Sequence, residues 1–105
     1  MATPNYIITA EELKATLATK KNSIVLLDVR DQEEYDEFHL EESKLIPLDE
    51  ISMRGPKELN KQDDIVIFCS HGMRSLNALM ALKMAGFEKL RSLEGGLHAF
   101  QGHEE

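Results

Sequence analysis

The sequence predicts an α/β protein with a mostly parallel five-stranded sheet covered by helices on both faces. Short apolar runs alternate along the chain with segments of helical spacing, which is the pattern of parallel sheets. Two of these runs, residues 24–29 and Ile65–Phe68, are apolar almost throughout. Such continuity indicates strands that are buried on both faces, as in the centre of a parallel sheet.

The N-terminal segment predicts an edge strand followed by a helix. Residues 6–8 are a short apolar run, and Thr9 opens a capping box, a hydroxyl residue followed three positions later by Glu. Leu13 and Leu17 are four residues apart and therefore lie on one face of the predicted helix. The polar residues 20–22 close it.

A second helix and a third strand follow the buried run at residues 24–29. Asp31 is a typical N-cap, and acidic residues in the next turn suit the positive end of a helix. Tyr35 and Phe38 are three apart and are expected on its inner face. Residues 45–48 predict a third strand, which Pro47 must end or place at an edge.

The middle of the chain is expected to be irregular before the next strand. Residues 49–53 predict a helical turn, residues 55–56 (Gly-Pro) break the chain, and residues 57–63 form a polar, helix-like stretch. The strand Ile65–Phe68 comes next.

The C-terminal part predicts a buried helix, a fifth strand and a short last helix. The first helix is expected to end at Gly86, the strand to cover residues 89–93, and the turn at Gly95 and Gly96 to lead into a helix through Phe100. The apolar residues of the helix before Gly86 are expected in the core, and its two methionines are expected to fill gaps there. These residues are Leu76, Leu79, Met80, Leu82 and Met84.

The only cysteine, Cys69, stands where the strand Ile65–Phe68 gives way to the predicted helix. The first amides of a helix lack partners, and the helix dipole places partial positive charge there. A thiol in this position is expected to lose its proton easily, and a loop curled by Gly72 can present several amides to an anion. A small buried hydrophobe at a strand end is the plain alternative. Gly72, Arg74 and the helix start favour a nucleophile.

Three motifs resemble the rhodanese-like sulfurtransferases. Residues 69–75, Cys-Ser-His-Gly-Met-Arg-Ser, are similar to the active-site loop of that family, in which a cysteine is followed by two variable residues, glycine, a variable residue, arginine, and serine or threonine. Two further motifs of the family occur in the same order along this chain. They are Leu-Asp-Val-Arg at residues 27–30, and Leu-Glu-Gly-Gly followed by an aromatic residue within residues 93–100. The resemblance spans nearly the whole chain and implies one rhodanese-like domain, residues 1–105, with a three-layer fold.

The resemblance implies a thiosulfate or persulfide sulfurtransferase that carries sulfur as a persulfide on Cys69. It implies a small sulfur-donor anion or persulfide as one partner, a thiol, cyanide or protein as acceptor, and neither metal nor organic cofactor. The catalytic residue would be Cys69, with loop amides facing its sulfur and Arg74 as a cation near the entrance. The substrate-binding residues would be Ser70, His71, Gly72, Met73, Arg74 and Ser75.

The loop departs from thiosulfate-specialised relatives, which carry basic residues in the two positions after the cysteine. Here Ser70 and His71 occupy them. Thiosulfate is a dianion, so this change puts its role as donor in doubt. A loop histidine is charged only at acidic pH, so His71 is interpreted as a lining residue rather than a proton donor.

Several other polar residues are interpreted as structural. The motif residues Asp28 and Arg30 are expected to tie strands together through buried hydrogen bonds. His39 is interpreted as a satisfied structural histidine, and His98 and His103 with Glu104 and Glu105 are too irregularly placed for a metal site. The remaining motif residues, which serve backbone geometry and not phosphate binding, are Glu94, Gly95 and Gly96.

The composition and charge exclude several classes of partner. The net charge of −7 among 105 residues argues against nucleic-acid binding. The acidic residues concentrate between Asp28 and Asp64, with a net charge of −8, whereas residues 65–91 carry +3. No apolar run has the length of a membrane span, and residues 1–8 do not resemble a signal peptide. A single cysteine cannot form an intrachain disulfide, so a cytoplasmic location is expected.

Two other functions remain open. A cysteine phosphatase or arsenate reductase on the same fold needs five residues between cysteine and arginine, and here residues 70–73 make four. The shorter loop suits one sulfur atom better than a tetrahedral oxyanion. A non-catalytic module that binds or regulates another protein is the other alternative, although Cys69 and Arg74 are both present.

Overall fold

A computed structural model describes residues 5–20 and 23–102 and contains the predicted sheet. Its five strands lie in the order β1-β5-β4-β2-β3, and every neighbouring pair is parallel. The strands are β1 (Ile7–Ile8), β2 (Val25–Asp28), β3 (Lys44–Leu45), β4 (Ile65–Phe68) and β5 (Leu90–Leu93).

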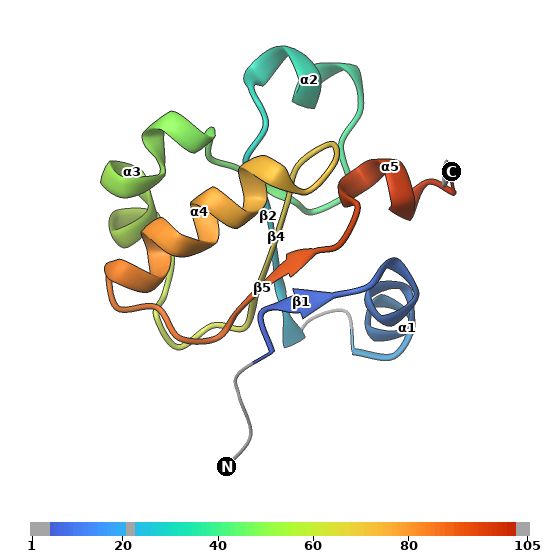
Figure 1. The fold of residues 1–105 in the computed structure, drawn as a ribbon, viewed down its shortest axis with the longest axis horizontal. Coiled ribbons are helices and arrows are strands. Elements are labelled where there is room, and N and C mark those ends of the chain that lie inside the picture. Colours follow the sequence, from blue (N-terminus) through green and yellow to red (C-terminus); the bar gives the residue numbers. More distant parts are fainter. Residues whose placement is uncertain (1–4, 21–22, 103–105) are drawn as a thin grey trace.

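The helices cover both faces of this sheet, as the sequence predicts (Figure 1). Helices α3 and α4 pack against each other on one side, and α1 and α5 contact each other on the other side. Helix α2 lies beyond the ends of the strands. The helices are α1 (Ala10–Lys20), α2 (Gln32–Glu37), α3 (Ile51–Glu58), α4 (Met73–Met84) and α5 (Gly96–Phe100), with a 3-10 turn, η2 (Leu48–Glu50), before α3.

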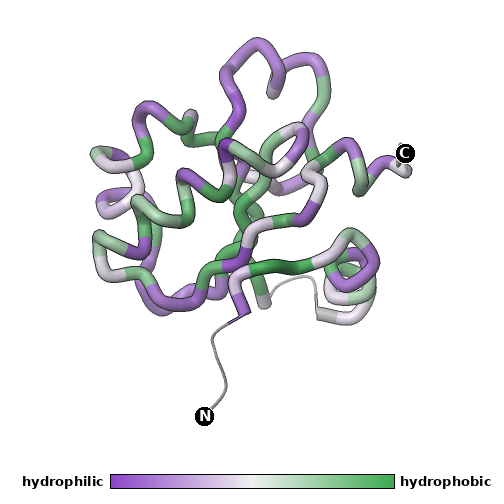
Figure 2. Tube along the Cα trace, viewed as in Figure 1, coloured by the Kyte–Doolittle hydropathy of each residue, from purple (hydrophilic) through white to green (hydrophobic). Residues whose placement is uncertain are grey.

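Strand β4 divides its side chains between two cores. Ile65 and Ile67 belong to the cluster under α3 and α4, whereas Val66 and Phe68 belong to the cluster under α1 and α5. All four are fully buried, and the strands at the centre of the molecule are its most hydrophobic part (Figure 2). Because successive side chains of a strand point to opposite faces, an unbroken apolar run is what a doubly covered strand requires.

The registers of the central strands bring two predicted motifs to one edge of the sheet. Asp28, the last residue of β2, is paired with Phe68, the last residue of β4. The chain after Phe68 and the chain after Asp28 therefore leave the sheet side by side. Sites in parallel α/β proteins form at this carboxyl edge.

The Gly-Pro pair does not break the chain, contrary to the prediction. Gly55 and Pro56 lie inside α3, which ends at Glu58. Of the helix-like stretch predicted at residues 57–63, only residues 57 and 58 are therefore helical. Gly55 is buried, and a Cβ atom there would come within 2.7 Å of the Leu82 side chain. Close packing against α4 therefore decides the conformation of this segment over local propensity. The predicted strand at residues 45–48 is also shorter, because Pro47 caps η2.

Four apolar residues that were expected inside lie on the surface, namely Phe38, Leu76, Met80 and Met84. Leu76, in the first turn of α4, is 41% exposed. Phe38 is 45% exposed because α2 ends before it and its backbone is extended. Met80 and Met84 are 63% and 89% exposed, so the prediction of core methionines is wrong. The buried side of α4 instead carries Ser75, Ala78, Leu79 and Leu82.

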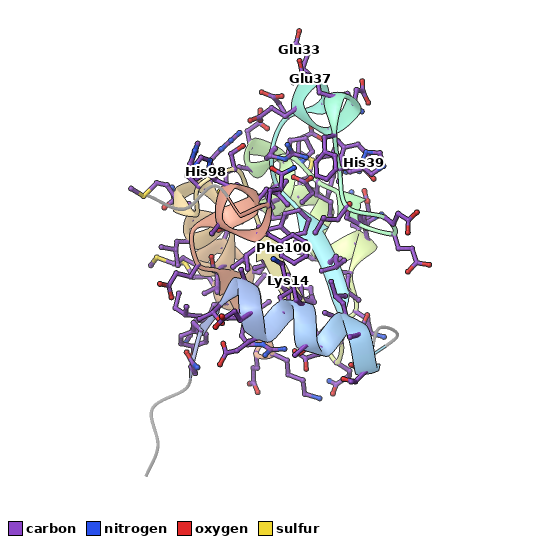
Figure 3. All side chains as sticks on the ribbon, turned by 90° about the vertical axis from the view of Figure 1, so that its right-hand side faces the viewer. Lys14, Glu33, Glu37, His39, His98 and Phe100 are labelled. Carbon is purple, nitrogen blue, oxygen red and sulfur yellow. The ribbon has the colours of Figure 1, made fainter. Side chains whose placement is uncertain are left out.

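The α1 side of the sheet is closed by the C-terminal helix. The ammonium group of Lys14 on α1 lies 5.2 Å from the ring centre of Phe100 on α5 (Figure 3). The sequence predicts that the first helix ends at residues 20–22, and α1 ends at Lys20. Residues 21–22 and 103–105 lie outside the described part of the chain, so the interpretations of Lys21, Asn22, His103, Glu104 and Glu105 stay predictions. Among the helices of residues 5–20 and 23–102, none has the length and apolar character to cross a bilayer.

Candidate active site

Cys69 stands between β4 and α4, as predicted. Gly72 precedes α4 as its N-cap and has a φ of +105°, a conformation that favours glycine. A Cβ atom at Gly72 would also lie 3.5 Å from the backbone nitrogen of Gly95. The loop therefore turns from strand to helix over three residues, with the cysteine at its base.

Two backbone amides converge on the cysteine sulfur. The N–H of Gly72 donates to Sγ at 3.1 Å, and the N–H of Ser75 donates at 3.3 Å. The sequence-based expectation involved all the amides from Ser70 to Ser75, and the structure narrows it to these two. Donors fixed by a loop and by the first turn of a helix stabilise negative charge on the sulfur.

The thiol is buried in this conformation. Cys69 is 1% exposed and belongs to the core cluster under α3 and α4. The residues that follow it are more accessible: Ser70 and Gly72 are half-buried, and His71 and Met73 are exposed. The loop thus covers the sulfur, and a reagent needs a shift of the loop to reach it.

Helix α5 holds the cysteine loop from the other side. The N–H groups of Leu97 and His98 donate to the carbonyl oxygens of Cys69 and Ser70, at 2.8 and 2.9 Å. Gly96 has a φ of +62°, and a Cβ atom there would lie 2.5 Å from both carbonyl oxygens. The geometric role predicted for the two glycines has this physical basis at Gly96, because only a residue without a side chain allows the contact.

The remaining members of the glycine motif, Glu94 and Gly95, precede α5. Glu94 is exposed, and its N–H donates to the carbonyl oxygen of Ile8 at 2.8 Å. At Gly95 φ is +74°, and a Cβ atom would come within 2.6 Å of the Ala99 Cβ.

Ser75 contributes its amide to the site and its hydroxyl to the core. Its Oγ donates to the carbonyl oxygen of Gly72 at 3.1 Å and lies 2.7 Å from the Oγ of Ser92 on β5. Both serines are buried. The buried side chain of Ser75 therefore fixes the loop to β5.

Arg74 is not the free cation that the sequence suggests. Its Nη1 and Nη2 donate to the two carboxylate oxygens of Glu34 on α2, at 2.7 and 2.9 Å. This hydrogen-bonded guanidinium lowers the pKa of Glu34 from 4.5 to about 2, although desolvation acts in the opposite direction. The carboxylate in turn raises the pKa of Arg74, and the charge of Cys69 adds to this effect. The positive charge near the cysteine is thus largely neutralised.

Glu34 is a residue of the candidate site that sequence reasoning missed, because it contacts both Arg74 and Ser70. It accepts a hydrogen bond from the Ser70 hydroxyl at 3.2 Å, and it completes the capping box of α2 with Asp31. The capping box is visible in the sequence. The contact with Arg74, forty positions away, is visible only in the fold.

Asp28 and Arg30 form a buried ion pair at the same edge of the sheet. Arg30 Nη2 lies 2.8 Å from the Asp28 carboxylate, and both side chains are almost fully buried. The same Nη2 donates to the carbonyl oxygen of Phe38 at the end of α2. The predicted buried hydrogen bonds are present, but they connect β2 to the end of α2 and not to another strand.

A cavity of about 280 Å³ lies beside the loop, between α2 and α5. His71 and His98 meet at its wall with ring centres 4.9 Å apart. The cavity is lined by Arg30, Glu34, Glu37, Phe38, Ser70, His71, Leu97, His98 and Gln101. Among residues 5–20 and 23–102, no group of three or more His, Cys, Asp or Glu side chains is arranged to hold a metal ion. His39 lies outside the cavity, stacked on Tyr35, with its Nδ1 2.8 Å from the Tyr35 carbonyl oxygen.

The fold and the cysteine loop define a rhodanese-like domain. The chain matches the profile of the family described as "Rhodanese-like domain" over residues 9–103, and it belongs to this family. A solved structure of the rhodanese-like domain from Anabaena protein Alr3790 superimposes with a TM-score of 0.88 at 28% identity, covering 95% of this chain and 76% of that one.

Several relatives have names that refer to sulfur, GlpE and YrkF among them. The thiosulfate sulfurtransferase GlpE of Coxiella burnetii is 31% identical over 87% of this chain and 84% of that protein. The putative sulfur carrier protein YrkF of Bacillus subtilis is 39% identical over 79% of this chain, and the matched part makes up 44% of YrkF. The chain thus spans less than half of the length of YrkF. These relatives support rhodanese-type sulfur transfer at the level of the family.

Proposed function

We propose that the protein is a sulfurtransferase that carries a sulfane sulfur as a persulfide on Cys69. The observation that carries this proposal is the pair of amide hydrogen bonds from Gly72 and Ser75 to Sγ. Such donors favour the thiolate that attacks and the persulfide anion that results. The names of GlpE and YrkF support the same chemistry.

The reaction has two steps that balance without a redox partner. The Cys69 thiolate attacks the outer sulfur of the donor, an S–S bond forms at Cys69, and the donor's own S–S (or S–SO₃) bond breaks. A persulfide donor leaves as a thiolate, and thiosulfate leaves as sulfite. In the second step a thiol, cyanide or a protein cysteine attacks the terminal sulfur and regenerates the Cys69 thiolate.

The residues around Cys69 have distinct proposed roles. The loop residues Ser70 and His71 line the cavity through which a donor approaches. Met73 is 73% exposed and borders an apolar groove of about 350 Å³ on the other side of the loop, between α4 and the end of β5. A bulky apolar acceptor can approach there. Arg74 anchors the loop to α2 through Glu34.

The buried sulfur implies that the loop moves during turnover. Because Cys69 is 1% exposed, alkylation by iodoacetamide should be much slower in the native protein than in urea. Measuring both rates by intact mass gives the fraction of time that the thiol is accessible. Equal rates would mean that the loop does not protect the sulfur.

The decisive test is the mass of the protein after donor treatment. The wild-type protein should gain about 32 Da with thiosulfate or a persulfide, and a thiol should remove this mass. Cys69 is the only cysteine, so the added sulfur is assigned without peptide mapping. In Cys69→Ser the added mass and the sulfur transfer to cyanide should both disappear, while circular dichroism shows the same fold. A wild-type protein that never gains sulfur contradicts the proposal.

A phosphatase assay with p-nitrophenyl phosphate separates the rival enzyme class. Four residues separate Cys69 from Arg74, and the Arg74 guanidinium is occupied by Glu34. No turnover of the phosphate ester is therefore expected. Turnover that depends on Cys69 would favour the phosphatase.

A further inference from the structure

The only arginine in the cysteine loop is already bound by a carboxylate. Both guanidinium nitrogens of Arg74 that face α2 donate to Glu34, and the Ser70 hydroxyl donates to the same carboxylate. The other arginine at the cavity, Arg30, is paired with Asp28. Neither guanidinium is therefore available to compensate the charge of an incoming anion.

The remaining charge at this cavity is negative. Glu37 is exposed at the cavity wall, and the reactive form of Cys69 adds a thiolate. A dianion that approaches the thiolate at pH 8 thus meets like charge, and no lysine or arginine among the described residues that line the cavity is free to compensate it.

We infer that Glu34 determines the donor class by neutralising Arg74, so that the site selects persulfides with an ammonium or uncharged body over dianionic donors such as thiosulfate. This inference rests on the proposed sulfur transfer. Glu34 is a specificity-determining residue that acts through Arg74, and it does not take part in the exchange of sulfur itself.

Glu34→Gln isolates the charge from the structural role of this residue. Glutamine keeps an oxygen that accepts from the Asp31 amide, so the capping box of α2 is retained. It also keeps an acceptor for one guanidinium nitrogen while releasing the positive charge of Arg74. The fold is checked by circular dichroism and by urea unfolding.

Glu33→Gln is the matched control. Glu33 is in the first turn of the same helix, is exposed, and points away from the body of the molecule (Figure 3). The control changes the net charge of the protein by the same amount. It leaves the contact between Glu34 and Arg74 in place.

The experiment compares donors that all present a terminal sulfane sulfur and differ in the charge of the rest of the molecule. The rate of the 32 Da addition to Cys69 is measured at pH 8 with the persulfides of cysteamine and of 3-mercaptopropionate, and with thiosulfate. The wild-type protein should prefer the ammonium-bearing persulfide over the carboxylate-bearing one by about tenfold in kcat/KM. In Glu34→Gln this preference should fall to about twofold, and kcat/KM for thiosulfate should rise about tenfold. Glu33→Gln should resemble the wild type.

Ionic strength gives a second measurement that needs no variant. The wild-type preference should shrink between 50 and 500 mM NaCl, because salt screens the repulsion of the anionic donors. The inference is overturned if all donors label Cys69 but the preference is absent, or if the two glutamine variants behave alike. If no donor labels Cys69 in any variant, it is the proposed sulfur transfer that fails.

Discussion

The hydroxyl oxygens of Ser75 and Ser92 lie 2.7 Å apart beneath the cysteine loop, where both side chains are buried. Ser75 gives its only hydroxyl proton to the carbonyl oxygen of Gly72, so Ser92 is the donor between the two serines. This chain of hydrogen bonds runs from β5 through α4 to the loop. It couples the position of the Ser75 amide, and hence one of the two bonds to Sγ, to the sheet.

Removing Ser75 is expected to cost more than removing Ser92. Ser75→Ala leaves the buried Ser92 hydroxyl without its acceptor and removes one of two hydrogen bonds to the Gly72 carbonyl oxygen, which keeps the bond from the Leu76 amide at 3.4 Å. We expect a cost of about 1–3 kcal/mol. Ser92→Ala removes one donor only and costs about 1 kcal/mol. Urea unfolding measures both, with the exposed Ser52→Ala as a control that stays near zero. Equal costs for the two buried serines would contradict the assigned direction of the hydrogen bond.

Gly96→Ala is expected to disrupt the cysteine loop. The added Cβ would lie 2.5 Å from backbone atoms of Cys69 and Ser70, so either the loop or α5 must move. We expect a loss of about 2–4 kcal/mol in the free energy of unfolding and slower persulfide formation. Gly102→Ala is the matched control, because Gly102 also has a positive φ, +86°, but its Cβ would meet no atom within 4 Å. Similar losses in both variants would show that backbone strain alone is responsible.

Asp28→Ala should be among the most destabilising substitutions of a buried residue in this protein. It leaves the Arg30 guanidinium buried without its counter-charge, and breaking such a pair costs about 3–5 kcal/mol. Replacing both residues with apolar side chains should recover part of this loss. Chemical unfolding of the two single variants and the double variant measures the coupling. Additive losses would contradict a direct interaction.

The Glu34 carboxyl should titrate at an unusually low pH. Its pKa is lowered from 4.5 to about 2 by Arg74, so the stabilising contact is complete above pH 4.5 and is lost as the pH falls toward 2. Carboxyl ¹³C NMR of the wild-type protein should give this pKa. In Arg74→Met the pKa should move back toward 4.5, and the stability difference between the two proteins should shrink below pH 4.5. An unchanged pKa in Arg74→Met would rule out Arg74 as the cause.

Substitutions on the buried side of α4 should destabilise the protein, whereas substitutions on its exposed side should have little effect. Leu82 is fully buried, so Leu82→Ala is expected to cost about 2–5 kcal/mol. Met84 is 89% exposed, and Met84→Ser should change stability by less than about 0.5 kcal/mol. Thermal or urea unfolding distinguishes the cases. A large cost at Met84 would restore the sequence-based interpretation of a core methionine.

The elements that the sequence predicts well are those in which one local signal decides the structure. Strand β4 needs apolar residues at every position because both of its faces are covered, and the prediction follows from that continuity. The capping residue Asp31 and the glycine at position 72 likewise act within their own segments.

The features that the sequence does not predict depend on contacts between distant segments. Gly55 and Pro56 remain helical because Gly55 packs against Leu82, which local propensity does not include. Helix α4 has more apolar residues than its buried face has positions. Two of those buried positions are occupied by the small side chains of Ser75 and Ala78. The neutralised charge of Arg74 depends on Glu34, which the chain brings to the loop only when α2 is in place.

The contacts of α5 with the cysteine loop join two segments that are far apart in the order of synthesis. The carbonyl oxygens of Cys69 and Ser70 are held by the amides of Leu97 and His98, near the C-terminal end of the described chain. During synthesis the thiol leaves the ribosome well before these partners do. A nascent or truncated chain that ends before Gly96 therefore carries the cysteine without the two α5 amides that hold the carbonyl oxygens of its loop.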